Sequence, residues 1–311
     1  MTLRFAPVSS AIPESFASMT FSVYRHLLRL TPQPRHPEQG DTREVQPIAR
    51  AAYDGDVPVG LVLGELPLDD QKGPEMLSLF TARGARRRGI GTELVAGLEA
   101  DVRERGFAEL ATTFMTGRPS IAAVERILSK RGWSDPVTRT VTLRFSPEQA
   151  LATPWFGRVR LHSDEFEIFT WKDLGDDERQ ALKRSQQEAP WIPAGLEPWR
   201  HDAHDFDEIS SLGLRYRGEI VGWVINHWVD AHTVRFTCSY VGRGLGRRGR
   251  ILPLYSAALE RLRAAGCQRC MFVTPVEYEN MVHFVRTRCA PWADFFGETK
   301  GSTKILTRTS E

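Results

Sequence analysis

The segment Arg86-Arg87-Arg88-Gly89-Ile90-Gly91 combines residue types that bind a pyrophosphate. It joins a predicted strand, residues 76–81, to a predicted helix, residues 92–104. Glycines let successive backbone N–H groups turn toward one point, and a helix start adds free donors and the positive end of its dipole. The neighbouring arginines add full positive charges. The segment therefore predicts an anion site of the kind that holds a pyrophosphate.

The same loop recurs in the second half of the chain. A gapless shift of 160 residues places Arg87-Arg88-Gly89 on Arg247-Arg248-Gly249. A repeat of this kind predicts an architecture built from two similar units. The length of 311 residues agrees with two domains of ordinary size. We expect these domains over residues 1–148 and 155–311.

Composition narrows the class of protein. The net charge of +2 gives no support to a nucleic-acid partner. No stretch approaches the roughly 20 apolar residues that span a bilayer, so no membrane association is expected. The first residues resemble no basic-then-apolar signal sequence, and this favours a cytoplasmic location. Cys267 and Cys270 have metal or redox spacing, but no second pair completes a zinc site, so no metal is expected.

Hydrophobic periodicity predicts one order of elements in both halves. In the first half we expect a helix over 14–30, an exposed loop over 31–47, and then strands at 48–53, 57–63 and 76–81, a helix over 92–104, a strand at 108–115, a helix over 120–131 and a last strand at 137–145. A linker is predicted at 146–154. The second half repeats the order and ends in a predicted hairpin over 294–306. Each domain is therefore predicted to be α+β, with a central mixed but mostly antiparallel sheet flanked by helices.

The Arg/Gly loop and the elements around it resemble the Gcn5-related N-acetyltransferase (GNAT) superfamily. The signature of that superfamily is Arg/Gln-x-x-Gly-x-Gly/Ala between its fourth strand and third helix, and Arg86, Gly89 and Gly91 satisfy it. The resemblance covers most of residues 1–145 and, more weakly, 155–308. Tandem members of the superfamily are known, so the resemblance implies a protein of two GNAT-like domains.

The resemblance implies transfer of an acetyl group from acetyl-coenzyme A to the amine of a small molecule. Backbone N–H groups of the loop would hold the pyrophosphate, and the strand edge before it would pair with the pantetheine arm. A backbone N–H near Phe80 or Thr81 would polarise the thioester oxygen. The residues implied in coenzyme A binding are Leu79, Phe80, Thr81, Arg86, Arg87, Arg88, Gly89, Ile90, Gly91 and Thr92.

Acetyl transfer to an amine needs a base, because a protonated amine cannot attack a thioester. Glu75 is the candidate, since histone acetyltransferases of the superfamily carry their base glutamate at about this spacing before the loop. The alternative is that Glu75 is an exposed glutamate at a strand end. The tyrosine that many members use as an acid is replaced by Leu128, so the residues name no acid. The second half has Arg235 at the position of Glu75, and this favours the first half as the active one.

The second half departs from the signature and leaves other functions open. Gly246 stands where Arg86 does, and Ile251 stands where Gly91 does. One alternative is therefore a non-catalytic or regulatory coenzyme A binding protein, and another places catalysis in the C-terminal domain. The loop at 191–199, with two tryptophans and two prolines, is consistent with a wall of an acceptor pocket or with a structural anchor. The acceptor and the oligomeric state cannot be read from the sequence.

Overall fold

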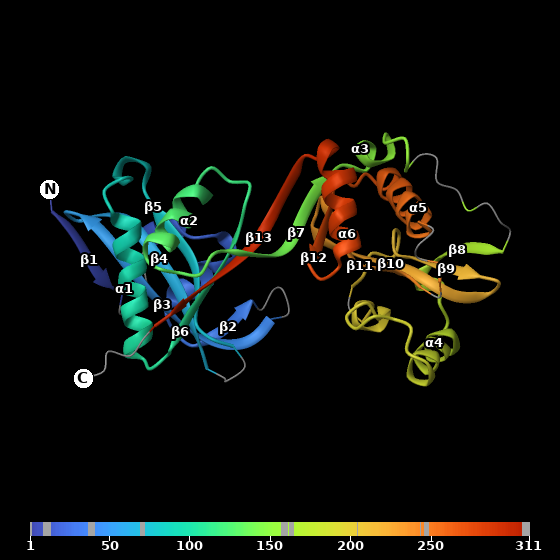
Figure 1. Cartoon of the computed structure of the whole chain (residues 1–311), viewed down its shortest axis with the longest axis horizontal. Helices are drawn as coiled ribbons and strands as arrows, with labels where there is room; N and C mark the ends of the chain where they lie inside the picture. The colour runs from blue at the N-terminus through green and yellow to red at the C-terminus, as the bar shows by residue number, and fades with distance from the viewer. Residues whose placement is uncertain are drawn as a thin grey trace. The chain divides into compact units, whose positions relative to one another are not determined.

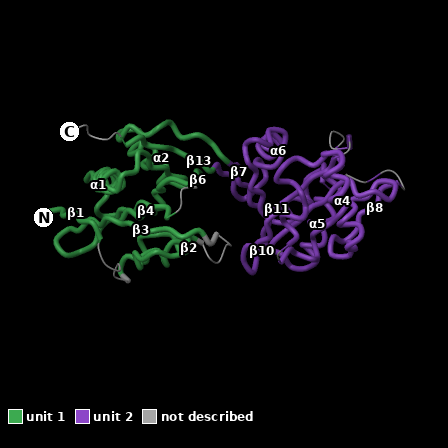
Figure 2. The backbone as a smooth tube through the Cα atoms, turned by 90° about the horizontal axis from the view of Figure 1, so that it is seen from below, with its two compact units in different colours: residues 1–139, 299–311 green, residues 140–298 purple. Residues whose placement is uncertain are grey.

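The computed structural model describes residues 2–8, 14–36, 41–68, 72–156, 161, 165–203, 205–242, 244–245 and 249–306. Its contacts divide the chain into two compact units (Figure 2). Unit 1 consists of Met1–Arg139 and Thr299–Glu311, and unit 2 consists of Thr140–Glu298. Each unit has a mixed sheet with helices on it, so the predicted fold class is confirmed. None of the helices in the described part of the chain has the length and apolar character that a membrane crossing requires.

Unit 1 contains a sheet with the strand order β1-β3-β4-β5-β6-β13, and β2 pairs with β3 outside this path (Figure 1). The strands are β1 (Leu3–Pro7), β2 (Gln33–His36), β3 (Asp41–Asp54), β4 (Val57–Pro67), β5 (Glu75–Thr81), β6 (Glu109–Met115) and β13 (Phe295–Ile305). Only β5 and β6 run parallel, while the other described pairs of this unit are antiparallel. Alternation along β4 sends side chains to both faces, and each face has its own apolar core.

Two groups of helices cover the two faces of this sheet. The helices α1 (Ile90–Glu104) and α2 (Ile121–Lys130) pack on one face, around Val62 and Met76. On the other face, the short 3-10 helices η1 (Glu14–Met19) and η2 (Ser22–Arg29) pack around Leu61, Leu63 and Leu77. A further 3-10 turn, η4 (Arg83–Ala85), lies between β5 and α1. The loop that carries the predicted anion site therefore follows a strand with buried faces.

Unit 2 contains a sheet with the order β7-β12-β11-β10-β9-β8. The strands are β7 (Val137–Phe145), β8 (Phe166–Thr170), β9 (Leu212–Tyr216), β10 (Glu219–Asp230), β11 (Thr233–Val241) and β12 (Arg269–Pro275). Here β11 and β12 are the parallel pair, as β5 and β6 are in unit 1. The two units thus repeat one topology, as the internal repeat predicts.

The helices of unit 2 also cover both faces of its sheet. One face carries α3 (Pro147–Leu151), α5 (Ile251–Ala264) and α6 (Glu279–Phe284) around a core rich in aromatic side chains. The other face carries α4 (Asp176–Glu188) and the loop that follows it. The remaining short elements are the 3-10 turns η5 (Trp171–Asp173), η6 (Pro198–Arg200) and η9 (Ala290–Trp292) and the π-helical turn η8 (Val285–Cys289).

The last strand of each unit comes from the other half of the sequence. In unit 2, β7 pairs with β12 from Phe145 opposite Cys270 to Thr140 opposite Pro275. In unit 1, β13 pairs with β6 from Thr299 to Ile305, and Figure 1 shows this red C-terminal strand among the strands of the N-terminal half. The expectation that 137–145 closes the first domain is therefore wrong, and the hairpin expected over 294–306 is one long strand. Because of the exchange, the units divide at 139/140 and 298/299, which differs from the division predicted at residues 148 and 155.

Two further expectations for the first half differ from the structure. The helix expected over 14–30 is two 3-10 helices, and the second ends at Leu30 with a left-handed φ of 56°. The loop expected over 31–47 contains β2 and the first part of β3. Pro47 is tolerated because it lies between the part of β3 that pairs with β2 and the part that pairs with β1. The prolines and charged residues of this segment predicted a loop, but pairing with β4 holds it as a strand.

The predicted linker at 146–154 contains a short helix. Ser146 accepts a hydrogen bond from the Gln149 backbone, and the Gln149 side chain accepts one from the Ser146 backbone. This capping box, with Pro147 in the first turn, begins α3 directly after β7. The segment is therefore ordered by local hydrogen bonds and by packing of Ala150 in the core of unit 2.

Candidate active site

The loop between β5 and α1 has the backbone conformation that an anion site needs. Arg87 has a φ of 64° and Gly89 a φ of 81°, both in the left-handed region. Gly89 is the N-cap of α1 and no side chain caps the helix start. The first backbone N–H groups of α1 therefore have neither an intrahelical acceptor nor a side-chain cap. Residues 86–89 just before the helix are exposed, so the positive end of the helix dipole lies beside solvent.

The three arginines of the loop have different surroundings. Arg86 donates from Nε to the Thr81 carbonyl at 3.2 Å and so closes the loop on the end of β5. Arg88 forms a 2.6 Å ion pair with Asp54 at the β3–β4 turn. Arg87 is exposed and has no ion-pair partner among the residues that the structure describes. Two arginines thus support the loop, and Arg87 remains available to an anion.

The strand edge next to the loop is open toward β6. Pairing of β5 with β6 is limited to Glu75 opposite Ala111 and Met76 opposite Thr112. Beyond Met76, β5 continues to pair with β4 as far as Thr81, so only its β6-facing edge lacks a strand partner. An extended ligand with amide groups can pair with such an edge as an added strand. Leu79, Phe80 and Thr81 lie on this open part of β5.

Gly91 is constrained by a neighbouring helix. A Cβ atom at this position would lie 2.9 Å from Cδ1 of Ile127 in α2 and 3.8 Å from the Thr81 hydroxyl oxygen. The absence of a side chain therefore lets α2 lie against the start of α1. Leu128, at the position where a tyrosine was expected in many relatives, is buried in the core beside α1. The described residues of α2 thus contribute packing at this site.

Glu75 belongs to a group of charged residues that the sequence reasoning did not predict. It lies directly opposite Glu65 in the β4–β5 pair. Arg35, from β2, pairs through Nε with Glu65 Oε1 at 2.7 Å and through Nη2 with Glu75 Oε2 at 2.5 Å. The alternative of a merely exposed strand-end glutamate does not fit, because the Glu75 side chain is only 21% exposed. The sequence signal for Glu65 is a single glutamate inside the otherwise apolar segment 57–67.

Burial changes the proton affinity of this group. The pKa of Glu65 is raised to about 7, first by burial and then by the charge of Glu75, against the opposing charge of Arg35. The pKa of Tyr24, from η2, is raised by burial and by Glu75. A carboxyl group that titrates near neutral pH is suited to proton transfer. The site therefore combines an anion-binding loop, an open strand edge and a carboxylate pair on neighbouring parts of β4 and β5.

The equivalent region of unit 2 contains a cavity. β11 and β12 pair only as far as Phe236 opposite Phe272, and a cavity of about 620 Å³ lies where they separate. Its walls are mainly apolar and include Phe236 and Phe272, while Tyr278 and Asn280 add polar groups. Gly249, before α5, has a left-handed φ of 64°. Arg243, Gly246, Arg247 and Arg248 of the second Arg/Gly loop lie outside the described residues.

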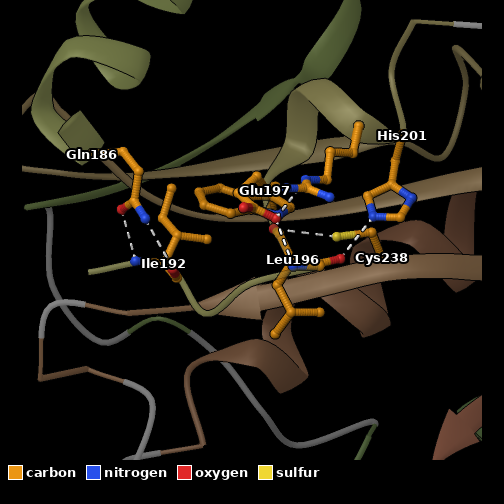
Figure 3. Close-up of polar contacts among 9 residues, drawn as sticks. Gln186, Ile192, Leu196, Glu197, His201 and Cys238 are labelled. Atoms are coloured by element: carbon orange, nitrogen blue, oxygen red, sulfur yellow. Dashed lines mark hydrogen bonds and ion pairs between the residues drawn. The ribbon is translucent and has the colours of Figure 1, made fainter. Parts of the chain in front are cut away.

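The loop at 191–201 is both an anchor and a wall of this cavity. The Gln186 side-chain oxygen accepts hydrogen bonds from the backbone N–H groups of Trp191 and Ile192, each at 2.9 Å, and Figure 3 shows the contact with Ile192. The Leu196 carbonyl accepts from the Trp223 indole at 3.1 Å and from the Cys238 thiol at 3.4 Å. Leu196 also lines the cavity. The loop is therefore a structural anchor, one of the two interpretations that the sequence left open, and it also lines this cavity.

The other polar motifs of the second half have structural partners. Cys267 and Cys270 are buried free thiols. Asp202 accepts a hydrogen bond from the Trp171 indole and pairs with Arg179. Over the described ranges, no three side chains of His, Cys, Asp or Glu gather as they would around a metal ion.

Comparison with known proteins identifies the class of protein that has this fold. Residues 16–128 match the family model described as the Acetyltransferase (GNAT) family. A solved tandem GNAT protein from the clavulanic acid biosynthesis pathway has a TM-score of 0.58 at 16% identity, with 99% of this chain and 100% of that chain covered. No curated protein gives a significant sequence match.

Two further solved structures have similar folds. One contains a GCN5-related glucosamine N-acetyltransferase region in a fungal multi-domain β-N-acetylglucosaminidase, with a TM-score of 0.56 at 14% identity over 97% of this chain and 38% of that chain. The other is a GCN5-related N-acetyltransferase from Sphaerobacter thermophilus, with a TM-score of 0.52 at 16% identity over 85% of this chain and 82% of that chain. Residues 16–128 thus match the GNAT family model, and the chain as a whole has the fold of a tandem GNAT protein, in agreement with the resemblance inferred from its Arg/Gly loop.

Proposed function

We propose that this protein transfers an acetyl group from acetyl-coenzyme A to the amine of a small molecule, and that unit 1 is the catalytic unit. The observation that carries the proposal is the uncapped start of α1 at Gly89, which follows the open edge of β5 after the short turn η4. Together they offer a site for a pyrophosphate next to a site for an amide-bearing arm. Coenzyme A has these two groups, a pyrophosphate and a pantetheine arm, next to each other.

The donor site uses the residues expected from the sequence. Backbone N–H groups from Arg87 to Thr92 hold the pyrophosphate, and Arg87 adds a charge. Arg86 and Arg88 hold the loop in place through Thr81 and Asp54. The backbone of Leu79, Phe80 and Thr81 pairs with the pantetheine arm and polarises the thioester oxygen. Ile90, which is buried, fixes the first turn of α1 in the core.

An amine of a small molecule is the acceptor in this proposal. One fold relative supports it by name, because it contains a glucosamine N-acetyltransferase region. The carboxylates at the start of the open part of β5 support it chemically, since an amine must lose a proton before it attacks. Glu75, the predicted base, lies there and is held by Arg35.

Calorimetry and a turnover assay together test the proposal. Titration with acetyl-coenzyme A should show one strong site, which Gly91→Leu removes because a side chain there meets Ile127 at 2.9 Å. Release of the coenzyme A thiol should then be measured with a panel of primary amines. Binding together with turnover supports the proposal. Binding without turnover on any amine favours the non-catalytic or regulatory alternative, and no binding rejects the donor site.

A second candidate function is catalysis by unit 2. The observation that favours it is the 620 Å³ cavity between β11 and β12, with Tyr278 and Asn280 in its wall. Ser239→Phe would fill this cavity, because Ser239 lines it from β11. If Ser239→Phe abolishes thiol release while Gly91→Leu leaves it intact, unit 2 carries the chemistry. The opposite pattern assigns the chemistry to unit 1.

A further inference from the structure

The charged group at Arg35, Glu65 and Glu75 lies at the closed end of the opening between β5 and β6. Glu75 is opposite Ala111 in the first of the two residue pairs that join these strands, and the strands separate after the second. Glu65 lies opposite Glu75 on the other side, in the antiparallel pair with β4. The carboxylates therefore lie next to the place where a ligand that enters the opening must stop.

Arg35 engages both carboxylates but leaves one oxygen without a partner. Its Nε lies 2.7 Å from Glu65 Oε1, and its Nη2 lies 2.5 Å from Glu75 Oε2. Glu65 Oε2 is buried and has no hydrogen-bond partner among the described residues. Since Glu65 as a whole is 5% exposed, this oxygen has lost its hydration without replacement. An oxygen in this state carries a free-energy cost that a bound cation or proton would remove.

The unpaired oxygen of the group indicates the kind of ligand. The two carboxylates face the Arg35 guanidinium, and the charge of Arg43, from β3, also lowers the pKa of Glu65. Tyr24, from η2, is the other titratable group beside them. A small ammonium group can donate a hydrogen bond to an unpaired carboxylate oxygen, which none of these groups does for Glu65 Oε2.

We propose that Glu65 binds the ammonium group of the acceptor and takes its proton, while Arg35 and Glu75 hold the Glu65 carboxylate in position. This inference rests on the proposed function and names the acceptor class, a primary amine that arrives as a cation. It assigns to Glu65 the role that the sequence suggested for Glu75. Glu75 becomes a positioning residue, because its Oε2 holds the Arg35 guanidinium that also contacts Glu65.

The proton balance of the step is complete. The ammonium R–NH3+ gives one proton to Glu65 Oε2 and becomes R–NH2. The amine nitrogen then attacks the thioester carbon, the C–N bond forms and the C–S bond breaks. The departing thiolate takes the second proton from nitrogen, and the third stays on the amide. Glu65 releases its proton to solvent before the next cycle.

A pH profile with two matched glutamine variants tests the assignment. In the wild type, kcat/KM should fall as pH drops below the range in which Glu65 ionises, which its burial places near neutral pH. Glu65→Gln should lower kcat by about 100-fold or more and remove this acidic limb. Glu75→Gln should lower the rate but keep the limb. Glu104→Gln, at an exposed position in α1, is the matched control and should change neither.

Binding of an ammonium probe separates this inference from the proposed function. Glutamate carboxyl carbons are labelled with carbon-13, and the resonance missing in Glu65→Gln identifies Glu65. Butylammonium should shift that resonance, while butanol should not. An unshifted Glu65 resonance overturns the inference even if acetyl transfer occurs. A shifted resonance without any turnover retains the cation site and rejects only the acetyltransferase function.

Two outcomes of the activity assay would also overturn it. The first is that Glu65→Gln keeps the acidic limb while Glu75→Gln removes it, which would make Glu75 the proton acceptor. The second is that both variants keep the wild-type profile. Calorimetry with acetyl-coenzyme A and the thermal midpoint show whether either variant has lost the donor site or the fold, since neither glutamate belongs to the coenzyme A loop.

Discussion

Replacing Gly89 by alanine tests the conformation on which the donor site depends. Gly89 has a φ of 81°, and a Cβ atom there would meet nothing within 4 Å. The substitution therefore introduces backbone strain without a steric clash. Gly84 is the matched control, because a Cβ atom there also meets nothing within 4 Å and its φ is not in the left-handed region.

The expected size of the effect follows from this pair. Both substitutions reduce the freedom of the unfolded chain to a similar extent, so their difference isolates the left-handed backbone. That conformation costs an alanine about 1–2 kcal/mol. If the loop keeps its shape, Gly89→Ala loses this amount in unfolding free energy relative to Gly84→Ala. If the loop relaxes, the loss appears instead as affinity for coenzyme A, up to about 5- to 30-fold.

Two measurements on each variant check this reasoning. Urea denaturation gives the unfolding free energy without ligand, and calorimetry gives the affinity for coenzyme A. The sum of the two losses in Gly89→Ala should be about 1–2 kcal/mol larger than in Gly84→Ala. Equal sums for the two variants would refute the claim that a left-handed Gly89 presents the start of α1 to the pyrophosphate.

Three other predictions follow from buried contacts. Leu143→Ala, in the core of unit 2, should lower the free energy of unfolding by about 2–5 kcal/mol and should increase the rate of amide hydrogen exchange more in β12 than in β4. A larger increase in β4 than in β12 would contradict the assignment of β7 to unit 2. Glu99 accepts a hydrogen bond from the Trp133 indole at 2.8 Å and pairs with Arg131, so Glu99→Ala should lower the free energy of unfolding by about 1–3 kcal/mol and Glu99→Gln by less. Equal losses in urea denaturation would show that the indole hydrogen bond contributes nothing. The pKa of Glu65 is about 7 in the folded state and that of an unfolded glutamate is about 4.5, so its contribution to stability is full below pH 4.5 and is lost as pH rises through 7. Glu65→Gln should therefore gain stability relative to the wild type between pH 5 and pH 8, and a constant difference across that range would contradict the raised pKa.

Local signals in the sequence were sufficient for the conformation of the loop between β5 and α1 and for most elements. The 3.6-residue period that predicts a helix after the loop corresponds to α1, whose buried positions include Ile90, Leu94 and Leu98. Gly89 could be predicted as a special position, because a left-handed residue before a helix strongly favours glycine. These features depend on residues close together in the chain, so a short window contains the necessary information.

Features that depend on distant residues could not be predicted in the same way. Arg35 contacts Glu75 across 40 positions of sequence, and no pattern near Arg35 indicates such a partner. β7 and β13 show no local feature that selects a partner strand, and their sequences do not say which unit each joins. Glu65 was not a candidate because the predicted strand ended at residue 63, whereas β4 continues to Pro67. The candidate base in the sequence was therefore near the site, but its partners were not.

The strand exchange reverses the order in which the units can be completed during synthesis. Unit 2 is one continuous stretch, residues 140–298, and all of it has left the ribosome before residues 299–305 emerge. Unit 1 begins at the first residue, yet the free edge of β6 stays uncovered until residues 299–305 are made. The half translated first therefore finishes folding last, and a stop codon anywhere before residue 299 leaves it with an exposed strand edge that invites pairing with other chains.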